Sequence, residues 1–323
     1  MVSNGGGVAV KIDNLTKYYG KFLAVDHLNL EIYDREIFGF LGPNGAGKST
    51  TLLMLTTVLK PSDGTAYIYG VDIRKDPDRV RKMVGIAFQD PKLYWVHTPY
   101  ETLYWHARVC GYSSQEAKQV VRDVLTQFDM WEARRKRAFE LSGGMRKRVE
   151  IAKLFIQRPR LAIFDEPTAQ IDVSGKHMIW EMIKELRDEG STIILATNEL
   201  YEADVLSDRV GIIYKGRIAA LGTPQELKDT IPGGDVLELD LDKPIDDDTM
   251  EEIHEIREVV EVKRMNQRMR LYLNKVEEVL PRILTSLMER GYRVKRVDMR
   301  EPTLDDVFLH YTGVKLAREE TYA

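Results

Sequence analysis

Residues 42–50 read GPNGAGKST and lie between an apolar run, IFGFL (37–41), and a segment with helical spacing, STTLLMLTTVL (49–59). They match the pattern G-x-x-x-x-G-K-[ST], and a strand before it with a helix after it is the context in which this pattern forms a P-loop. Glycines let the backbone curl until its N–H groups and the positive end of the helix face an anion. We therefore predict a nucleotide phosphate site formed by Gly42, Pro43, Asn44, Gly45, Ala46, Gly47, Lys48, Ser49 and Thr50.

Charged and hydroxyl side chains in two segments suit phosphate chemistry. Lys48 can reach the β- and γ-phosphates, and the Ser49 hydroxyl can bind Mg²⁺. A second apolar run, LAIFDEP (161–167), ends in two carboxylates at the tip of a predicted buried strand, where ligands bind in open sheets. We expect Asp165 to hold Mg²⁺ through water and Glu166 to polarise an attacking water. Alone, these residues could form a simple acidic strand-to-turn junction; beside a P-loop, the functional interpretation is favoured.

The composition limits the class of protein. The chain has 323 residues, which suggests about two domains at roughly 150 residues each. Lys and Arg total 47 against 51 Asp and Glu, and the net charge of −4 argues against nucleic acid as a partner. The lone cysteine, Cys110, excludes an internal disulfide framework and fits a reducing compartment. Because we find no signal peptide and no apolar stretch of membrane-spanning length, we expect a cytoplasmic chain.

The order of apolar segments indicates two domains. Buried strands alternate with helices through most of the chain, which predicts an α/β fold with a mainly parallel, helix-covered sheet and some antiparallel strands. This pattern breaks near IPGGD (231–235), and the tail then reads strand, helix, strand, strand, helix, strand, helix, which suggests a small α+β, ferredoxin-like domain. We predict a first domain at 1–231, with a helical subdomain at about 92–145, and a second domain at 232–323.

The stretch LSGGMRKR (141–148) lies between the P-loop and LAIFDEP. Ser142, Gly143 and Gly144 begin a predicted helix, so a hydroxyl and bare N–H groups lie at its positive end. Together the three motifs resemble the nucleotide-binding subunits of ATP-binding cassette (ABC) proteins, over residues 8–230. The resemblance implies that the chain binds ATP and Mg²⁺ and that this helix start clamps the γ-phosphate of ATP on a second cassette. The working unit would be a head-to-tail pair with an identical or a paralogous partner.

Further family positions can be matched in the same way. Tyr19, in KYYGKFLAV, resembles the aromatic residue that stacks on adenine, with neighbouring Tyr18 as the alternative. Gln89, after VGIAF, resembles the glutamine that touches both Mg²⁺ and the attacking water. PTAQID (167–172) resembles the loop that crosses the dimer interface, although Gln170 stands where a small residue is usual.

Asn198, in ILATNELYEAD (194–204), departs from the family pattern. Most relatives have histidine there, contacting the γ-phosphate. Asparagine can donate an N–H but cannot become a cation, and losing one transition-state donor can slow a reaction about a hundredfold. Two interpretations stay open: Asn198 substitutes for histidine in an active ATPase, or this site binds ATP with attenuated hydrolysis as the regulatory half of a heterodimer. The intact Glu166, Lys48 and Gln89 favour the first.

Three classes of ABC protein compete for the function: a transporter motor, a soluble protein acting on DNA or ribosomes, and a regulator with little turnover. The short segment between Lys48 and Ser142 leaves no room for the long coiled coils of chromosome-type ABC proteins. The chain also carries one cassette, whereas ribosome-associated types usually carry two. In the transporter subunits that the chain resembles, a groove receives a helix from the membrane partner. Four aromatic residues after Gln89 either form the walls of that groove or fill the core of the helical subdomain: Tyr94, Trp95, Tyr100 and Trp105. These features favour the transporter motor.

The tail narrows the subclass. EPTLDDVFLHYTG (301–313) resembles the C-terminal signature of ABC ATPases of the daunorubicin/doxorubicin-resistance type. That resemblance implies a separate integral membrane permease of the type-2 export class as partner, with the ATPase on the inner face of the cell membrane. We therefore expect an exporter ATPase that dimerises on ATP, most simply as a homodimer.

Overall fold

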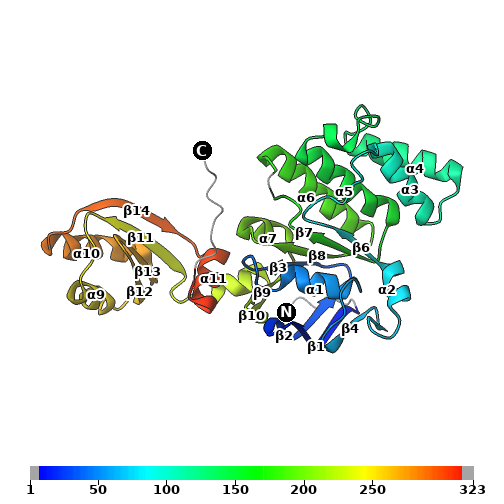
Figure 1. Cartoon of the computed structure of the whole chain (residues 1–323). Helices are drawn as coiled ribbons and strands as arrows, with labels where there is room; N and C mark the ends of the chain where they lie inside the picture. Colours follow the sequence, from blue (N-terminus) through cyan, green and yellow to red (C-terminus); the bar gives the residue numbers. More distant parts are fainter. Residues whose placement is uncertain (1–6, 170, 315–323) are drawn as a thin grey trace. The chain divides into compact units, whose positions relative to one another are not determined.

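The computed structural model describes residues 7–169 and 171–314, which divide into two compact units, Met1–Leu221 and Gly222–Ala323. Figure 1 shows the elements of both units coloured along the sequence. Within the described ranges, every helix is too short or too polar to cross a membrane.

The central sheet of the first unit has six strands in the order β10-β9-β3-β8-β7-β6. The five strands from β9 to β6 are parallel, and β3, β7 and β8 are buried throughout their length. Such strands need apolar residues on both faces, which is why they read as continuous apolar runs. The strands are β3 (Ile37–Leu41), β6 (Val84–Ala87), β7 (Leu161–Asp165), β8 (Thr192–Thr197), β9 (Arg209–Tyr214) and β10 (Arg217–Gly222).

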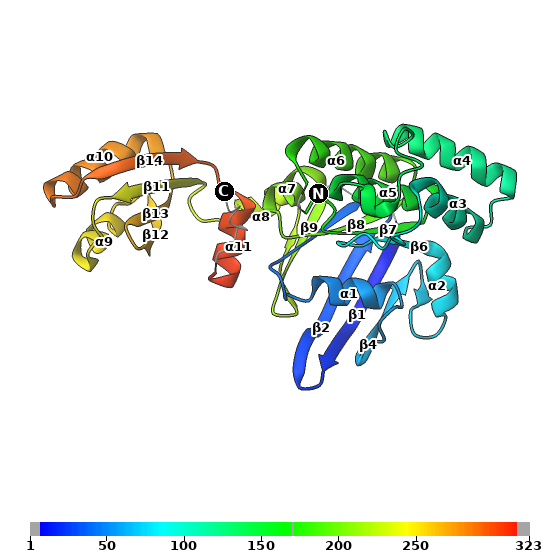
Figure 2. The same ribbon diagram turned by 45° about the horizontal axis from the view of Figure 1, so that its top comes forward.

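A second, antiparallel sheet covers one side of this unit, in the order β2-β1-β4-β5. Helix α1 (Lys48–Leu55) packs between the two sheets, where Leu52 and Met54 share one apolar core with Ile12 of β1 and Phe38 of β3 (Figures 1 and 2). This core fixes the helix that follows the P-loop. The strands are β1 (Val8–Tyr19), β2 (Phe22–Tyr33), β4 (Asp63–Ile68) and β5 (Val71–Asp72), and helix α2 (Pro77–Met83) follows them.

Helices build the other side of the first unit (Figure 1). A separate core joins apolar residues of α3, α4, α5 and α6 to Phe164 of β7 and Leu195 of β8. Thr98 and Ser113 close capping boxes with Glu101 and Glu116, which sets where α3 and α4 begin. The helices are α3 (Pro99–Val109), α4 (Ser114–Gln127), η1 (Ala138–Glu140), α5 (Gly143–Gln157), α6 (Val173–Asp188) and α7 (Leu200–Leu206).

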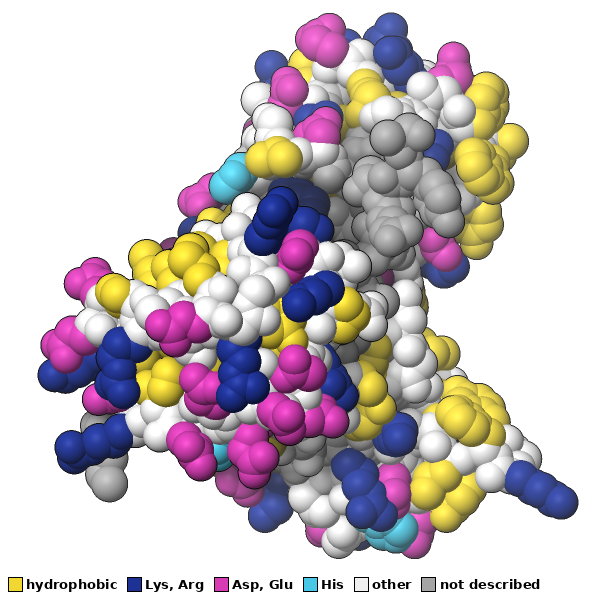
Figure 3. All heavy atoms as spheres, turned by 90° about the vertical axis from the view of Figure 1, so that its left-hand side faces the viewer, with side chains coloured by type: hydrophobic (Ala, Val, Ile, Leu, Met, Phe, Trp, Pro, Cys, Tyr) yellow, Lys and Arg dark blue, Asp and Glu magenta, His cyan; other side chains and the backbone are white. Residues whose placement is uncertain are grey.

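The second unit contains an antiparallel sheet in the order β12-β13-β11-β14, with apolar residues of α9 and α10 packed on one face. This is the βαββαβ arrangement of ferredoxin-like domains. On the face seen in Figure 3, basic and acidic side chains are interspersed. The elements are α8 (Pro224–Asp229), β11 (Asp235–Leu241), α9 (Asp247–His254), β12 (Val259–Met265), β13 (Arg268–Leu273), α10 (Val276–Glu289), β14 (Val294–Arg300) and α11 (Leu304–Thr312).

The structure divides the chain at Gly222, whereas the sequence pattern breaks at residues 231–235. The difference is helix α8, which packs against the last helix, α11, and so belongs to the second unit. Sequence position places α8 directly after the strands of the cassette, and nothing local to it reveals a partner some 80 residues further along the chain. A long-range contact therefore sets this boundary.

Buried charges attach α11 to the sheet of the second unit. Arg270 on β13 is only 2% exposed, and its guanidinium lies 2.5 Å from the Glu238 carboxylate and 2.9 Å from that of Asp306. Arg300 on β14 contacts the same two carboxylates. Asp306 also accepts the N–H of Thr303, which begins α11. The network thus joins three strands and the final helix through ionic hydrogen bonds.

We predict that Arg270→Leu lowers the free energy of unfolding of the second unit by about 3 kcal/mol, because it leaves the buried Asp306 and the partly buried Glu238 with only Arg300 bridging them. The measurement is a urea titration of the full chain. The matched control is Arg282→Leu, which breaks the exposed pair with Glu258 at 3.5 Å and should change stability by less than about 1 kcal/mol. Equal losses for the two variants would contradict the prediction.

Candidate active site

The P-loop runs from the end of β3 into α1, and two of its glycines are required by the backbone. Gly47 has φ 109°, in the left-handed region, and a Cβ there would lie 2.6 Å from the Ala24 carbonyl oxygen. A Cβ on Gly42 would lie 2.4 Å from the carbonyl oxygen of Ile213. A side chain at either position would displace backbone, so the loop holds its curled shape only with glycine.

Lys48 is buried inside this loop. Its Nζ donates to the carbonyl oxygens of Gly42, at 2.5 Å, and Pro43, at 3.3 Å, and lies 3.6 Å from Glu166 Oε1. Burial lowers the pKa of Lys48, and the neighbouring carboxylates of Glu166 and Asp165 oppose that shift. A buried ammonium with only partial charge compensation is well placed to attract phosphate oxygens.

Asp165 ends β7 beside the first turn of α1, where its carboxyl lies close to the Ser49 hydroxyl. Burial raises the pKa of Asp165, although Ser49 and Lys48 counteract it. Its buried Oδ1 has no hydrogen-bond partner within the described ranges. An orphaned carboxylate oxygen next to a hydroxyl is the oxygen-rich donor set that Mg²⁺ prefers, so these residues fit the ion that the sequence motifs imply.

Glu166 follows directly and has φ 44°, an uncommon value for a residue with a side chain. Its Oε2 accepts a hydrogen bond of 2.9 Å from Gln89 Nε2, and its backbone N–H donates to Ala196 at 2.8 Å. Gln89 comes from the loop after β6, the strand next to β7. The structure therefore brings together two residues that are 77 positions apart and were selected separately from the sequence.

Asn198 follows β8, the strand between β3 and β7. Its side chain is half-buried and, in the part of the chain that the structure describes, makes no hydrogen bond. The helix behind it is anchored by Glu202, a buried carboxylate that accepts hydrogen bonds from Thr168, at 2.7 Å, and Trp180, at 2.9 Å. The Asn198 amide is thus uncommitted on a firmly held segment, and its role at the γ-phosphate stays a prediction.

Ser142, Gly143 and Gly144, called the signature residues below, form a separate feature. Ser142 caps α5 by accepting the Met145 N–H at 3.2 Å, and a Cβ on Gly143 or Gly144 would meet no atom within 4 Å. The N-terminus of this helix is therefore open, and none of its described residues hydrogen-bonds to the P-loop of the same chain. An open helix start of this kind suits an anion brought by another molecule.

The stacking of Tyr19 or Tyr18 on adenine and the dimer contact of the loop 167–172, which ends at Asp172, remain predictions. Tyr18 and Tyr19, at the end of β1, are both exposed, so either ring is accessible to a base. Asp172 caps α6 by accepting the Gly175 N–H at 2.7 Å. Gln170, the unusual residue in the interface loop, lies outside the described residues.

Lys147 was not selected from the sequence. It lies on α5, just after the signature residues, and its Nζ donates to the carbonyl oxygens of Phe88, Gln89 and Glu166. Its position within LSGGMRKR was visible, but three basic residues follow one another there, and only the fold shows which of them points inward.

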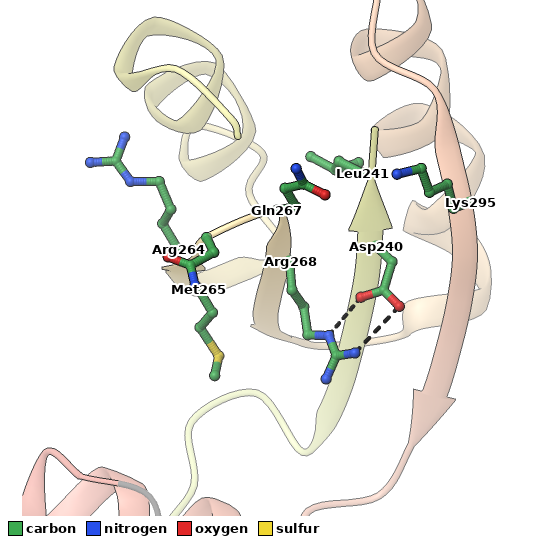
Figure 4. Close-up of a pocket in the computed structure, with 8 residues that line it drawn as sticks. Asp240, Leu241, Arg264, Met265, Gln267, Arg268 and Lys295 are labelled. Carbon is green, nitrogen blue, oxygen red and sulfur yellow. Dashed lines mark hydrogen bonds and ion pairs between the residues drawn. The ribbon is translucent and has the colours of Figure 1, made fainter. Parts of the chain in front are cut away.

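A hollow in the second unit shows no comparable chemistry (Figure 4). Arg268 and Asp240 lie in it and form a two-contact pair at 2.6 and 3.3 Å, so the guanidinium is already neutralised. The remaining lining residues are Leu241, Arg264, Met265, Asn266, Gln267 and Lys295. The P-loop and the carboxylates beside it all lie in the first unit.

A glycine-rich loop joins the buried strand β3 to a helix and encloses a lysine, and Asp165 and Glu166 lie at the end of β7, two strands away in the sheet. This arrangement defines a P-loop nucleotide-hydrolysing enzyme. Comparison with known proteins gives the family. Residues 25–169 match the model of the ABC transporter family, and residues 222–312 match that of the C-terminal domain of DrrA1-3-like ATP-binding proteins. The chain belongs to the ATP-binding proteins of ABC transporters.

Relatives extend over nearly the whole chain. The daunorubicin/doxorubicin resistance ATP-binding protein DrrA of Streptomyces peucetius is 34% identical over 307 residues, which is 94% of this chain and 92% of that protein. The Nod factor export ATP-binding protein I of Rhizobium etli is 32% identical over 316 residues, covering 96% and 95%. A solved dimer of an ATP-binding cassette in a post-hydrolysis state, bound to ADP and Pi, is 25% identical with a TM-score of 0.62, covering 66% of this chain and 98% of its own. The chain is thus an ATP-binding and ATP-hydrolysing subunit of an export-type ABC system.

We predict that Gly47→Ala abolishes measurable ATP binding, because the new Cβ meets the Ala24 carbonyl and the left-handed backbone disfavours alanine by about 1 kcal/mol. The control is Gly70→Ala, whose φ of 78° imposes the same backbone penalty but whose Cβ meets no atom within 4 Å. Equilibrium binding of a fluorescent ATP analogue measures both. Similar affinities for the two variants would show that loop geometry is not the cause.

Proposed function

We propose that this chain is the motor of an exporter: two cassettes pair head-to-tail on ATP and drive a separate membrane permease of the type-2 export class. The observation that carries the proposal is the separation of two half-sites on one chain. Lys48, Asp165, Glu166 and Gln89 gather around the P-loop, whereas the open helix start at Ser142 faces solvent. A second cassette would supply the missing helix start to each P-loop, and the permease would hold the pair at the inner face of the membrane.

In this proposal the residues of the site act in sequence on ATP. The phosphates enter the glycine loop, and Lys48 exchanges its carbonyl partners for phosphate oxygens. That exchange weakens its ion pair with Glu166, whose carboxylate then accepts a proton from the attacking water while Gln89 orients it. Asp165 and Ser49 would hold Mg²⁺, which when bound offsets phosphate charge. Asn198 would donate its amide N–H to the γ-phosphate.

We predict that Glu166→Gln reduces ATP turnover at least a hundredfold without loss of ATP binding, since the general base is removed while the phosphate loop stays intact. The companion variant is Asn198→His. If asparagine already does the work, histidine changes turnover by no more than a few fold; a gain approaching a hundredfold would instead mean that the natural site is attenuated. Turnover is measured as phosphate release, beside ATP affinity. Turnover that survives Glu166→Gln would contradict the proposed mechanism.

A groove on the helical subdomain supports the permease partner. Val96, His97, Glu101, Trp105, Arg137 and Phe139 line a cavity beside α3. Trp105 and Phe139 are each 59% exposed, and Tyr94 and Trp95 lie exposed nearby in sequence. Tyr100, expected as a further wall, instead packs against the subdomain core and stacks on Tyr104. Exposed aromatics around a cavity are typical anchors for a partner helix.

We predict that Trp105→Arg reduces co-purification of the cognate permease about tenfold or more, because a central aromatic anchor is typically worth at least 2 kcal/mol at an interface. Val109→Arg is the matched control: it lies on the same helix, is 86% exposed and does not line the cavity. The amount of permease retained on the tagged ATPase from detergent-solubilised membranes is the measurement. Equal retention by the two variants would place the permease contact elsewhere.

A further inference from the structure

Lys147 is a buried cation whose role none of the predicted motifs explains. It is 4% exposed, and its Nζ lies 2.9 Å from the Phe88 carbonyl oxygen and 3.1 Å from those of Gln89 and Glu166. An ammonium group has three protons to donate, so these three carbonyls use its full capacity. All three acceptors are backbone carbonyls, and they belong to two different loops.

The two loops diverge where their strands stop pairing. Strands β6 and β7 pair in parallel up to Ala87 and Phe164. Beyond this last pair, no strand pairing between β6 and β7 joins the segment that carries Gln89 to the segment that carries Glu166. Lys147 bridges the gap within two residues of the last pair, so it replaces the lost ladder bonds with charge-assisted ones.

Glu166 needs such support because its backbone is strained. A φ of 44° costs a residue with a side chain about 1–2 kcal/mol, and the surrounding structure must hold it there. The N–H of Glu166 is held by Ala196, and its carbonyl is held by Lys147. Helix α5 also contacts the loop after β6 at a second point, because the Glu150 carboxylate accepts the Lys92 N–H at 3.0 Å.

Burying the charged side chain of Lys147 at this position costs folding free energy. Burial lowers the pKa of Lys147 to about 8, and the carboxylates of Glu150, Asp165, Glu202 and Glu166 only partly oppose this. The three hydrogen bonds of the ammonium compensate part of the cost of burying its charge.

We propose that Lys147 is a positioning residue for ATP hydrolysis: by holding the backbone of residues 88, 89 and 166, it aligns the Glu166 carboxylate and the Gln89 amide on the attacking water. The inference rests on the proposed function in assigning those two side chains to the reaction. Lys147 follows Ser142 by little more than one helical turn, so the helix that would receive the γ-phosphate of the partner also fixes the catalytic loops of its own chain.

The first test needs no turnover. Hydrogen–deuterium exchange is measured on the nucleotide-free full chain as wild type, Lys147→Met and Arg148→Met. Arg148 is the matched control, since it also donates from α5 to a backbone carbonyl, that of Phe128, away from the site. We expect Lys147→Met to speed exchange at least tenfold in residues 88–93 and 166–169, and Arg148→Met to leave both segments unchanged. Wild-type exchange in both segments of Lys147→Met would overturn the proposal.

The second test separates positioning from a purely structural role. Lys147→Met should lower kcat roughly tenfold to a hundredfold, as small misplacements of reacting groups do, while the dissociation constant for ATP stays within about twofold. Lys147→Gln keeps two donors and should fall between Met and the wild type; it also serves if Lys147→Met does not fold. Parallel losses of kcat, ATP affinity and thermal stability would reduce Lys147 to a structural residue and overturn the proposal. Failure of the Glu166→Gln prediction would remove the proposed mechanism, whereas the exchange result on Lys147 would stand.

Discussion

The backbone at Gly42 and at Gly47 has no room for a side chain, because the carbonyl oxygens of Ile213 and Ala24 lie against these two positions. This close packing fixes the curl of the loop, and the curl places Lys48 within reach of Glu166. The core between the two sheets fixes the helix behind it. The rest of the site depends on this constraint, since Asp165, Glu166 and Asn198 end neighbouring strands that meet at the same edge of the sheet as the loop.

Charge balance explains why the site is ready for ATP. Two buried lysines, Lys48 and Lys147, lie close to the two carboxylates of Asp165 and Glu166. The two lysines have different tasks. Lys48 donates to a carbonyl of the P-loop, and phosphate oxygens can take the place of that carbonyl. Lys147 donates to three backbone carbonyls of the loops that carry Gln89 and Glu166, which the proposed mechanism needs in fixed positions. In the proposed mechanism, a negatively charged nucleotide therefore displaces the carbonyl contacts of Lys48 and leaves those of Lys147 intact.

The second unit is stabilised by a different principle. Its sheet carries an apolar face covered by α9 and α10, and on β13 the buried Arg270 joins Glu238 to Asp306 of the last helix. A buried ionic network of this kind is weak evidence for high stability but strongly constrains which partners can meet. It therefore specifies the attachment of α11, the segment that carries the subclass signature.

The sequence by itself determined the features that depend on local chemistry. The P-loop, the continuous apolar strands, the carboxylates at Asp165 and Glu166 and the helix start at Ser142 follow from residue types at fixed spacing, because a glycine turn, a buried strand or a helix cap is decided within a few residues. Only the tertiary structure decided which side chains meet across the chain: the Gln89–Glu166 bond, the inward turn of Lys147, the packing of Tyr100 against the subdomain core, the burial of Arg270, and the grouping of α8 with α11. Lys147 and Arg148 are neighbours with similar chemistry, and the helix alone gives no reason for one to be buried against two loops. That choice depends on residues some 20 to 60 positions away, where packing rather than local spacing sets the partner.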